Sequence, residues 1–340
     1  MLPSTGDRED GVSPDGRLSR KGGSVWLRVG LPITILAAGF ALALGLSQAL
    51  SRFARDRAVE TVLDSTAPAP DAAVAALPQP ESGAPLRLAL APVLSPESSL
   101  LRYQRLADYI AGRLGRQGRL LIQSGYAQTN ELLREGRCDV ALVCTYAFLR
   151  VRDAYGVQAL VVPRVHGKTT YRSILIIAAD NPAESLLDLA GRRFATADEM
   201  STSGWLYPAV WLKERGRDPA RFFSEVEVVG AHDLAVKAVA YGDADCAAVH
   251  SLVYEQMPRD VLERTRVLDE SQEFGMPPFV VPANVPPEDR ERLLDAFLTL
   301  DQTVTGREIL VTLDIERFER PAPDLYRDVE DLVRRWEGTR

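Results

Sequence analysis

The chain has 340 residues, 46% hydrophobic and 26% charged, which is enough for a globular protein with two lobes or domains. Its formal net charge of −7 argues against nucleic acid as a partner, because a phosphate backbone requires a basic surface, but it leaves room for a small anion held by local donors. Three cysteines without CxxC spacing and three scattered histidines argue against a disulfide framework and a metal site. Walker A, GxGxxG, GxSxG and HExxH patterns are absent, so we expect no cofactor and no enzymatic activity.

Three segments precede the globular part. Residues 1–24 are polar and predict a disordered tail. Residues 25–50 contain an uncharged run of 21 residues, 29–49, which is long enough for one transmembrane helix. The small-x-small pattern at 47–49 also fits signal peptidase cleavage, so an uncleaved anchor and a removed signal segment both stay open. Residues 51–85 are rich in proline and alanine and predict a semi-extended linker to an exported domain.

From residue 86 onward, apolar strand patterns alternate with amphipathic helix patterns. The expected strands are 86–91, 120–124, 139–143, 173–178 and 193–196. The expected helices are 100–114, 129–135, 205–214, 289–300, 305–313 and 324–336. Such alternation predicts α/β layers with mainly parallel strands, in which ligands bind at the carboxyl ends of the strands. We expect the C-terminal helices to brace the first lobe.

Three consecutive hydroxyl residues and a glycine, Ser201-Thr202-Ser203-Gly204, lie between an expected strand and an expected helix. Free backbone N–H groups and the helix dipole at such a junction favour an anion, and the hydroxyls add donors that suit a tetrahedral oxyanion. The alternative is ordinary helix capping, since serine and threonine are preferred N-cap residues.

An internal repeat suggests two lobes of similar design. The stretch 129–141 has a counterpart at 235–247, in which Gly136 corresponds to Gly242 and Asp139 to Asp245. In each copy the pattern predicts a helix that ends at glycine and a buried strand that follows aspartate. Two such lobes facing a cleft describe a clamshell binding protein, although helix–Gly–x–x–Asp–strand also recurs by chance in α/β proteins.

Several motifs, in order, resemble the PhnD-like family of phosphate, phosphite and phosphonate solute-binding proteins of ABC transporters. The resemblance covers about 86–297 and rests on the segments 125–127, 136–141, 171–176, 201–204, 230–232 and 242–245. It implies a two-lobed α/β clamshell of type II, in which lobe 1 comprises about 86–170 plus 262–340 and lobe 2 about 171–261. One N-terminal transmembrane helix would precede this solute-binding domain of residues 86–340.

The resemblance also implies roles for individual residues. Ser201, Thr202 and Ser203 would bind the ligand oxygens, and the remaining donors would be Tyr126, Tyr171 and His232. All are hydrogen-bond donors, and an oxyanion needs several that converge. The alternatives are that Tyr126 is a core residue, that Tyr171 flanks a strand, and that His232 caps the helix that follows it.

The function implied is capture of an oxyanion in the periplasm for an inner-membrane permease, by a chain tethered to the inner membrane or secreted. The alternative is a membrane-anchored sensor or accessory subunit that uses the same binding fold to signal to a membrane partner. An enzyme on this scaffold has little support, because no nucleophile–base pair is recognisable.

Two positions depart from the family pattern. Members that take aminoalkylphosphonates carry acidic residues at positions that fall near Leu252 and Met276 in this chain, while Glu255 and Glu273 lie close in sequence. An ammonium group at an apolar position loses its charge partner and keeps its desolvation cost. We therefore expect weak binding of 2-aminoethylphosphonate and a preference for a compact or apolar-tailed oxyanion.

Overall fold

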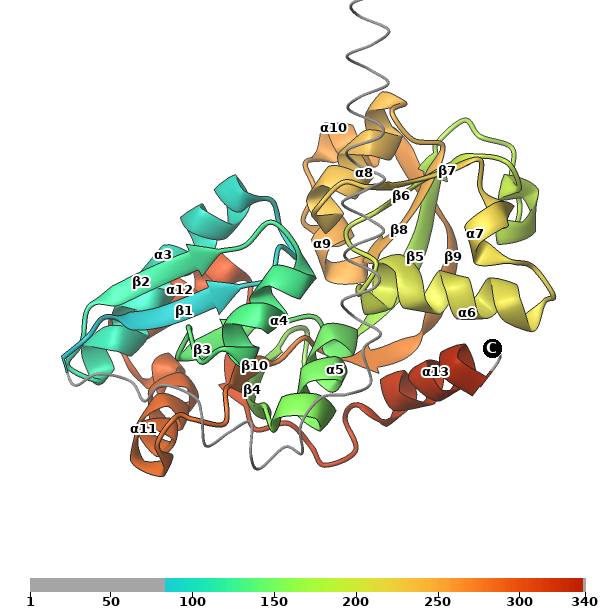
Figure 1. Ribbon diagram of the computed structural model, residues 1–340. Coiled ribbons are helices and arrows are strands. Elements are labelled where there is room, and N and C mark those ends of the chain that lie inside the picture. Colours follow the sequence, from blue (N-terminus) through green and yellow to red (C-terminus); the bar gives the residue numbers. More distant parts are fainter. Residues whose placement is uncertain (1–82, 339–340) are drawn as a thin grey trace, which may run out of the picture. The chain divides into compact units, whose positions relative to one another are not determined.

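The computed structural model describes residues 83–338, which form two lobes, each built around one β-sheet (Figure 1). The first sheet has the strand order β11-β4-β10-β3-β1-β2. Its strands are β1 (Leu86–Leu90), β2 (Gly118–Ile122), β3 (Val140–Leu142), β4 (Gln158–Arg164), β10 (Phe279–Val281) and β11 (Arg317–Glu319). The predicted two-lobed α/β architecture is confirmed.

The second sheet has the order β7-β6-β8-β5-β9. Its strands are β5 (Thr170–Ala178), β6 (Arg193–Thr196), β7 (Glu225–Val228), β8 (Cys246–His250) and β9 (Thr265–Gly275). Because β9 pairs with β5, the second lobe extends to residue 275, beyond the boundary at 261 expected from the sequence. The residues of β9 are mostly polar or charged and carry no strong strand signal, so only its pairing places it in this lobe.

Strand direction follows the prediction for most strands. It departs from it at the edge strand β11, which is antiparallel to β4, and where the chain crosses between lobes. Strands β1 and β2, β1 and β3, β6 and β7, and β6 and β8 pair in parallel. The crossing strands β5 and β10 are antiparallel to both neighbours in the sheet that each enters. The hinge consists of the two connections between the lobes, from β4 to β5 and from β9 to β10. Each crossing strand starts at this hinge and runs away from it, whereas the parallel strands of the sheet that it enters run toward the hinge. The carboxyl ends of the parallel strands in both lobes therefore face the junction between the lobes.

Helices pack on the faces of both sheets. In the first lobe they are α3 (Pro96–Arg113), α4 (Tyr126–Arg134), α5 (Thr145–Tyr155), α11 (Pro287–Leu298), η4 (Leu300–Gln302) and α12 (Val304–Leu313). In the second they are η2 (Leu186–Leu189), η3 (Thr202–Leu206), α6 (Tyr207–Glu214), α7 (Pro219–Phe222), α8 (His232–Tyr241), α9 (Ser251–Glu255) and α10 (Arg259–Leu262). The last helix is α13 (Arg327–Gly338).

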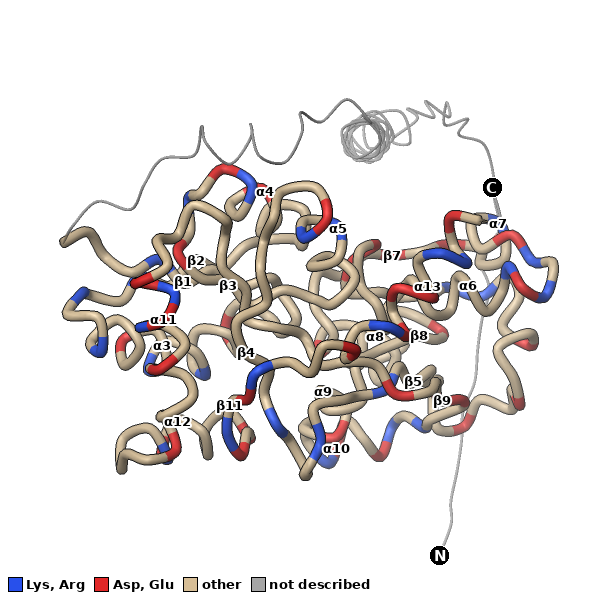
Figure 2. The backbone as a smooth tube through the Cα atoms, turned by 90° about the horizontal axis from the view of Figure 1, so that it is seen from below, with Lys and Arg blue, Asp and Glu red and all other residues tan. Residues whose placement is uncertain are grey.

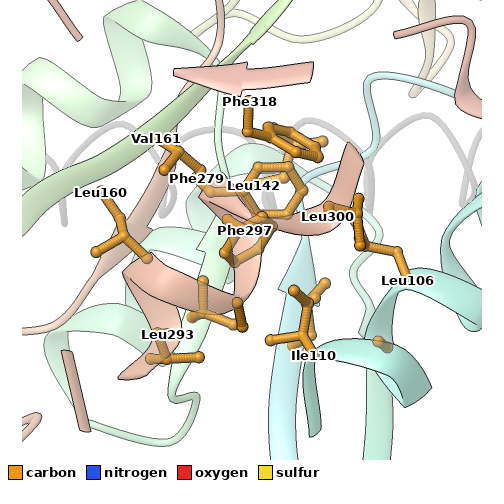
Figure 3. Packing of buried hydrophobic residues seen from close by; sticks show 14 of the residues in the cluster. Leu106, Ile110, Leu142, Leu160, Val161, Phe279, Leu293, Phe297, Leu300 and Phe318 are labelled. Carbon is orange, nitrogen blue, oxygen red and sulfur yellow. The ribbon is translucent and has the colours of Figure 1, made fainter. Parts of the chain in front are cut away.

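The core of the first lobe is centred on three phenylalanines from different elements (Figure 3). Phe279 of β10, Phe297 of α11 and Phe318 of β11 have ring centroids 4.9 to 5.6 Å apart, in tilted or edge-to-face arrangements that aromatic rings favour. Helices α11 and α12 contribute buried residues to this core. The expectation that C-terminal helices brace the first lobe is therefore confirmed for these two.

Helix α13 differs from that expectation, because it contacts both lobes. On the first lobe, Arg152 of α5 forms an ion pair with Glu330 at 2.6 Å. On the second, Arg335 pairs with Glu214 of α6 at 2.7 Å, and Lys213 Nζ donates to the Trp336 carbonyl at 3.1 Å. Figure 1 shows α13 beside α6. The C-terminal helix thus joins the two lobes beside the hinge.

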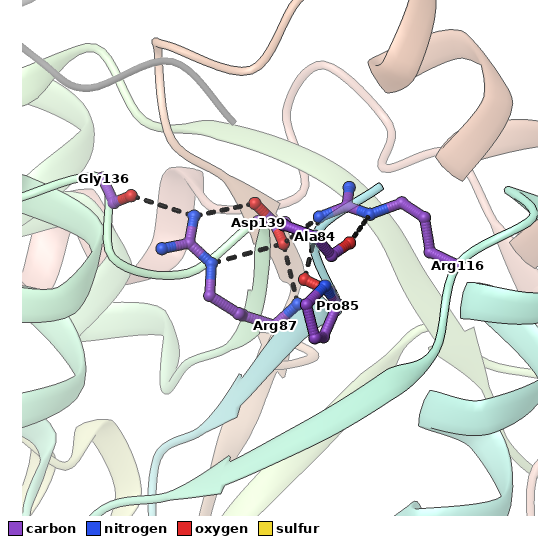
Figure 4. A network of polar contacts seen from close by, with 6 residues as sticks. All are labelled: Ala84, Pro85, Arg87, Arg116, Gly136 and Asp139. Carbon is purple, nitrogen blue, oxygen red and sulfur yellow. Dashed lines mark hydrogen bonds and ion pairs between the residues drawn. The ribbon is translucent and has the colours of Figure 1, made fainter. Parts of the chain in front are cut away.

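The internal repeat is present in three dimensions and includes an arginine that the sequence pattern did not reveal. Asp139 accepts hydrogen bonds from the backbone N–H of Arg87 at 2.7 Å and from its guanidinium at 2.9 Å (Figure 4). Asp245 accepts the same two bonds from Arg193, both at 2.9 Å. Each aspartate thus fixes the strand that follows it against the parallel neighbour that carries the arginine, β3 against β1 and β8 against β6. Arg116 adds a second cation at 3.1 Å from Asp139 only (Figure 4).

The two aspartates should differ in their contribution to stability. Asp139 is 2% exposed, so Asp139→Asn leaves partly buried arginines without their counter-charge and should lower the free energy of unfolding by about 3 kcal/mol. Asp245 is 30% exposed, and Asp245→Asn should cost about 1 kcal/mol or less. Urea unfolding of both variants checks this difference, and equal losses would contradict it.

The predicted tail, membrane segment and nearly all of the linker, residues 1–82, lie outside the described residues. Within 83–338, no helix is long and apolar enough to cross a membrane. Basic and acidic residues are interspersed over this part of the chain (Figure 2).

Candidate oxyanion site between the lobes

The loops that follow β6 and β7 hold most of the candidate residues, Ser201, Thr202 and Ser203 after β6 and His232 after β7. These strands are parallel neighbours, so their carboxyl ends emerge side by side. After β6 the chain forms a single turn of π-helix, η3, in which both Trp205 and Leu206 donate their N–H groups to the Ser201 carbonyl, at 3.1 and 2.9 Å. Such turns are rare and frequently occur at functional sites.

Ser201 and Gly204 shape this turn. Ser201 Oγ accepts the N–H of Gly204 at 3.0 Å, so the capping role considered from the sequence is present. A side chain at Gly204 would place its Cβ 2.8 Å from Thr196 Oγ1, a contact too close for any other residue. The geometry of the turn itself therefore explains why serine is at position 201 and glycine at position 204.

Thr202 connects the lobes. Its Oγ1 accepts the N–H of Tyr146 at 2.9 Å, in the first turn of α5, and its own N–H lies 3.3 Å from Cys144 Sγ. Both partners belong to the first lobe, and the bond caps a helix terminus that lacks a side-chain cap of its own. In this arrangement Thr202 holds the lobes together.

The remaining three hydroxyls lack a hydrogen-bond partner among the described residues. Tyr126 Oη, Tyr171 Oη and Ser203 Oγ are all buried, and they come from α4, β5 and η3. The Tyr126 hydroxyl lies beside Ser201, and the Tyr171 hydroxyl lies beside Thr202, Ser203 and Thr145. A buried hydroxyl without a partner costs about 1–3 kcal/mol, so three that converge indicate a site built for a polar ligand.

Both tyrosines are hydrogen-bond donors at neutral pH. Burial raises the pKa of Tyr126 and of Tyr171 well above 10, and the nearby Cys144 thiol acts in the same direction. Their hydroxyls therefore keep their protons. Together with Ser203, they supply three neutral O–H donors, the chemistry that an oxyanion requires.

His232 joins this cluster from the amino end of α8. Its backbone N–H donates to the Val93 carbonyl of the first lobe at 3.0 Å. The backbone N–H of His250 donates to His232 Nδ1 at 3.3 Å, so the proton of the neutral ring is on Nε2, which lies 3.3 Å from Ser201 Oγ. Burial lowers the pKa of His232 to about 4, partly offset by Asp233. The ring is a neutral donor.

This depressed pKa predicts a loss of stability in mild acid. Below pH 6.5 the unfolded chain takes up a proton at this residue, whereas the folded chain does so only near pH 4, so falling pH stabilises the unfolded state relative to the folded one. Between pH 7 and 5 the contribution should be about 2 kcal/mol. Urea unfolding across this range should show a shallower pH dependence for His232→Gln. The exposed His166, changed to Gln, is the control; an equal slope in both variants would contradict the expectation.

His250 belongs to the site, although sequence reasoning counted it only among the scattered histidines. Its ring stacks on Tyr171, with centroids 3.8 Å apart and 6° between planes, and its Nδ1 has no partner among the described residues. Burial lowers its pKa well below 6.5, so it is neutral. Its position in the sequence could have indicated this role. His250 ends an apolar strand, and ligands in such folds bind at the carboxyl ends of strands.

The two lobes are in contact around this cluster. Asp198 accepts the N–H of Tyr126 at 2.9 Å, and Asp233 accepts the N–H and the hydroxyl of Ser95 at 2.8 and 2.7 Å. Tyr126 and His232 occupy corresponding positions of the repeat, and each begins a helix whose first N–H bonds to the opposite lobe. All six residues expected from the sequence thus lie at this junction. Among residues 83–338, no group of three His, Cys, Asp or Glu side chains is placed to hold a metal.

Comparison with known proteins identifies the family. Residues 88–326 match the family described as ABC transporter, phosphonate, periplasmic substrate-binding protein. The chain belongs to this family. It is similar to the phosphate-import protein PhnD of Mycolicibacterium smegmatis, with 29% identity over 178 residues, 48% of this chain and 54% of that one.

A second curated relative and a solved structure are also similar to this chain. The phosphonates-binding periplasmic protein of Escherichia coli is 24% identical over 221 residues, 63% of this chain and 65% of that one. The matches thus span less than two thirds of both curated family members. A binding protein component of an ABC phosphonate transporter from Pseudomonas aeruginosa has the same fold, with a TM-score of 0.70, 20% identity, and coverage of 77% of this chain and 90% of that one.

Proposed function

We propose that the protein binds a phosphate-like or phosphonate oxyanion between its lobes and presents it, chemically unchanged, to the permease of an ABC importer. The observation that carries this proposal is the convergence of three buried hydroxyls, Tyr126, Tyr171 and Ser203, that have no hydrogen-bond partner within residues 83–338, beside the neutral ring of His232. Membership of a periplasmic substrate-binding family and similarity to a phosphate-import protein and a phosphonates-binding protein support it.

Ligand binding would favour the closed arrangement of the lobes. Tyr126 belongs to the first lobe, Ser203 and His232 belong to the second, and Tyr171 lies in the strand that begins at the hinge. An anion that accepts hydrogen bonds from the hydroxyls of Tyr126, Tyr171 and Ser203 holds the lobes together, and its affinity for the closed state alone shifts the equilibrium toward closure. Direct contacts such as that of Thr202 with Tyr146 add to this preference.

The test is a thermal-shift panel on the full chain in mild detergent with phosphate, phosphite, methylphosphonate, 2-aminoethylphosphonate, sulfate and taurine. A ligand at a hundred times its dissociation constant should stabilise the protein by about 2.7 kcal/mol, a shift of a few degrees. A shift with a phosphorus oxyanion is expected. If none of these phosphorus compounds shifts the transition, the proposed function is wrong.

We further propose that residues 25–50 tether the binding domain to the outer face of the inner membrane. The support is the uncharged run of 21 residues and the proline-rich spacer that follows it. Alkaline extraction of membranes tests this: the tethered protein should stay with the membrane pellet, and release of a shortened chain into the periplasmic fraction would show cleavage instead.

A further inference from the structure

The first lobe has its own counterpart of Ser201 at the start of α3. Ser95 lies eight residues after Arg87, and Ser201 lies eight residues after Arg193, the two arginines that bind the corresponding aspartates of the internal repeat. Each serine is the N-cap residue of the helix that follows β1 or β6. The repeat therefore gives each lobe a helix amino terminus that begins with serine at the corresponding place.

At the amino terminus in the first lobe, a carboxylate from the second lobe is bound. Asp233, in the first turn of α8, accepts the backbone N–H of Ser95 at 2.8 Å and its hydroxyl at 2.7 Å, and Ser98 Oγ lies 3.5 Å from the same carboxylate. Asp233 is buried, and the Ser95 side chain makes no cap bond within α3. Free N–H groups and the helix dipole favour a negative charge at such a terminus. Asp233 thus occupies, as a part of the chain, a position suited to an anion.

The lobes differ at the residue that corresponds to Asp233. Tyr126 and His232 correspond in the repeat, so the counterpart of Asp233 is Ala127. Alanine has no hydrogen-bonding side chain, so α4 offers no carboxylate to the terminus at Ser201. One of the two corresponding termini is therefore bound by the chain itself, and the other is the one proposed to bind an external oxyanion.

Other hydrogen bonds also join the lobes through protein atoms alone. Asp198 of the second lobe accepts the N–H of Tyr126 at 2.9 Å, at the first residue of α4. Arg102 of α3 donates to Gln256 of the second lobe at 2.5 Å. These bonds need no ligand, so they stabilise the closed arrangement before one binds.

We propose that Asp233 is a latch that keeps the lobes closed in the free protein, so that a ligand enters and leaves through a minor open state. Opening separates Asp233 from Ser95 and so breaks both of their hydrogen bonds. This inference goes beyond the proposed function, because it concerns the protein before ligand binds. The latch stabilises the closed state equally with and without ligand, so it largely cancels in the affinity but slows both association and dissociation.

The distance between two spin labels tests the closed state directly, on the full chain in detergent micelles. The labels are attached at Leu101→Cys of α3 and Arg259→Cys of α10, both exposed, while the three native cysteines are buried. With Asp233 intact, pulsed electron resonance should give one short distance with or without phosphate or methylphosphonate. Asp233→Ala should lower the ratio of closed to open molecules about ten- to hundredfold and so add a longer distance.

Stopped-flow tryptophan fluorescence with the same two compounds tests the kinetic consequence. Asp233→Ala should raise both the association and the dissociation rate about tenfold or more, and change the affinity less than either rate. Ser95→Ala removes only the hydroxyl on the other lobe and should act in the same direction by a smaller factor. Asp218→Ala is the matched control, because Asp218 caps α7 within the second lobe through the N–H of Ala220, and it should leave distances and rates unchanged.

The outcomes separate the latch from the proposed function. If the free protein with Asp233 intact already shows the longer distance, and ligand removes it, the ligand closes the lobes and the inference is wrong. It is also wrong if Asp233→Ala and Ser95→Ala leave both distance and rates unchanged. If neither phosphorus compound binds but Asp233→Ala still adds the longer distance, the latch stands and the proposed function fails.

Discussion

Ser203→Ala is expected to weaken binding of a phosphorus oxyanion about ten- to hundredfold while leaving the unfolding temperature of the ligand-free protein close to that of the wild type. Ser203 Oγ is buried and has no partner among the described residues, so its removal breaks no bond in the free protein. In the complex it would donate to a charged acceptor, an interaction worth about 1.5–3 kcal/mol. Calorimetric titration and a thermal melt of the same sample measure both effects.

Ser201→Ala is the matched control for this prediction. Ser201 Oγ caps η3 through Gly204 and lies beside His232 Nε2, so its loss should destabilise the ligand-free protein by about 1 kcal/mol. The two serines are two residues apart, equally buried and chemically identical, and only their partners differ. If Ser203→Ala lowers stability as much as Ser201→Ala and leaves affinity unchanged, Ser203 does not contact the ligand.

Leu252→Glu is expected to reverse the preference against an ammonium substituent. Leu252 and His250 both line a cavity of about 90 Å³ between the lobes, and the replacement puts a carboxylate on the wall of this cavity. The affinity for 2-aminoethylphosphonate, divided by that for ethylphosphonate, should rise at least about tenfold, because a charge-assisted hydrogen bond contributes roughly 1.5–3 kcal/mol. Competition titration of the two ligands gives this ratio directly.

Leu252→Gln separates charge from size in this experiment. Glutamine has nearly the shape of glutamate but no charge, so the ratio should change little. The ratio matters more than either affinity, since a carboxylate near the site also repels the anionic part of both ligands. Equal ratios in the Glu and Gln variants would show that the substituent does not reach residue 252.

Local sequence patterns by themselves determined the fold class and the two-lobed organisation of this protein. Strand and helix periodicity predicted the α/β alternation, and the spacing of Gly136 and Asp139 from Gly242 and Asp245 predicted two lobes of one design. The resemblance added the six candidate residues, all of which lie at the junction of the lobes. These features depend on residues close in the chain, where φ/ψ preference, capping and side-chain periodicity act.

Only the tertiary structure decided which distant groups meet. Strand β9 joins the second sheet through backbone pairing with β5, which no periodicity specifies. The partner of Asp139 is Arg87, 52 residues away, and the partner of Thr202 is the Tyr146 N–H of the other lobe. His250 is a site residue because β8 pairs with β5, which places its ring against that of Tyr171. Hydrogen-bond partners and cavities are properties of packed surfaces, and packing brings together residues whose separation along the chain leaves no pattern to detect.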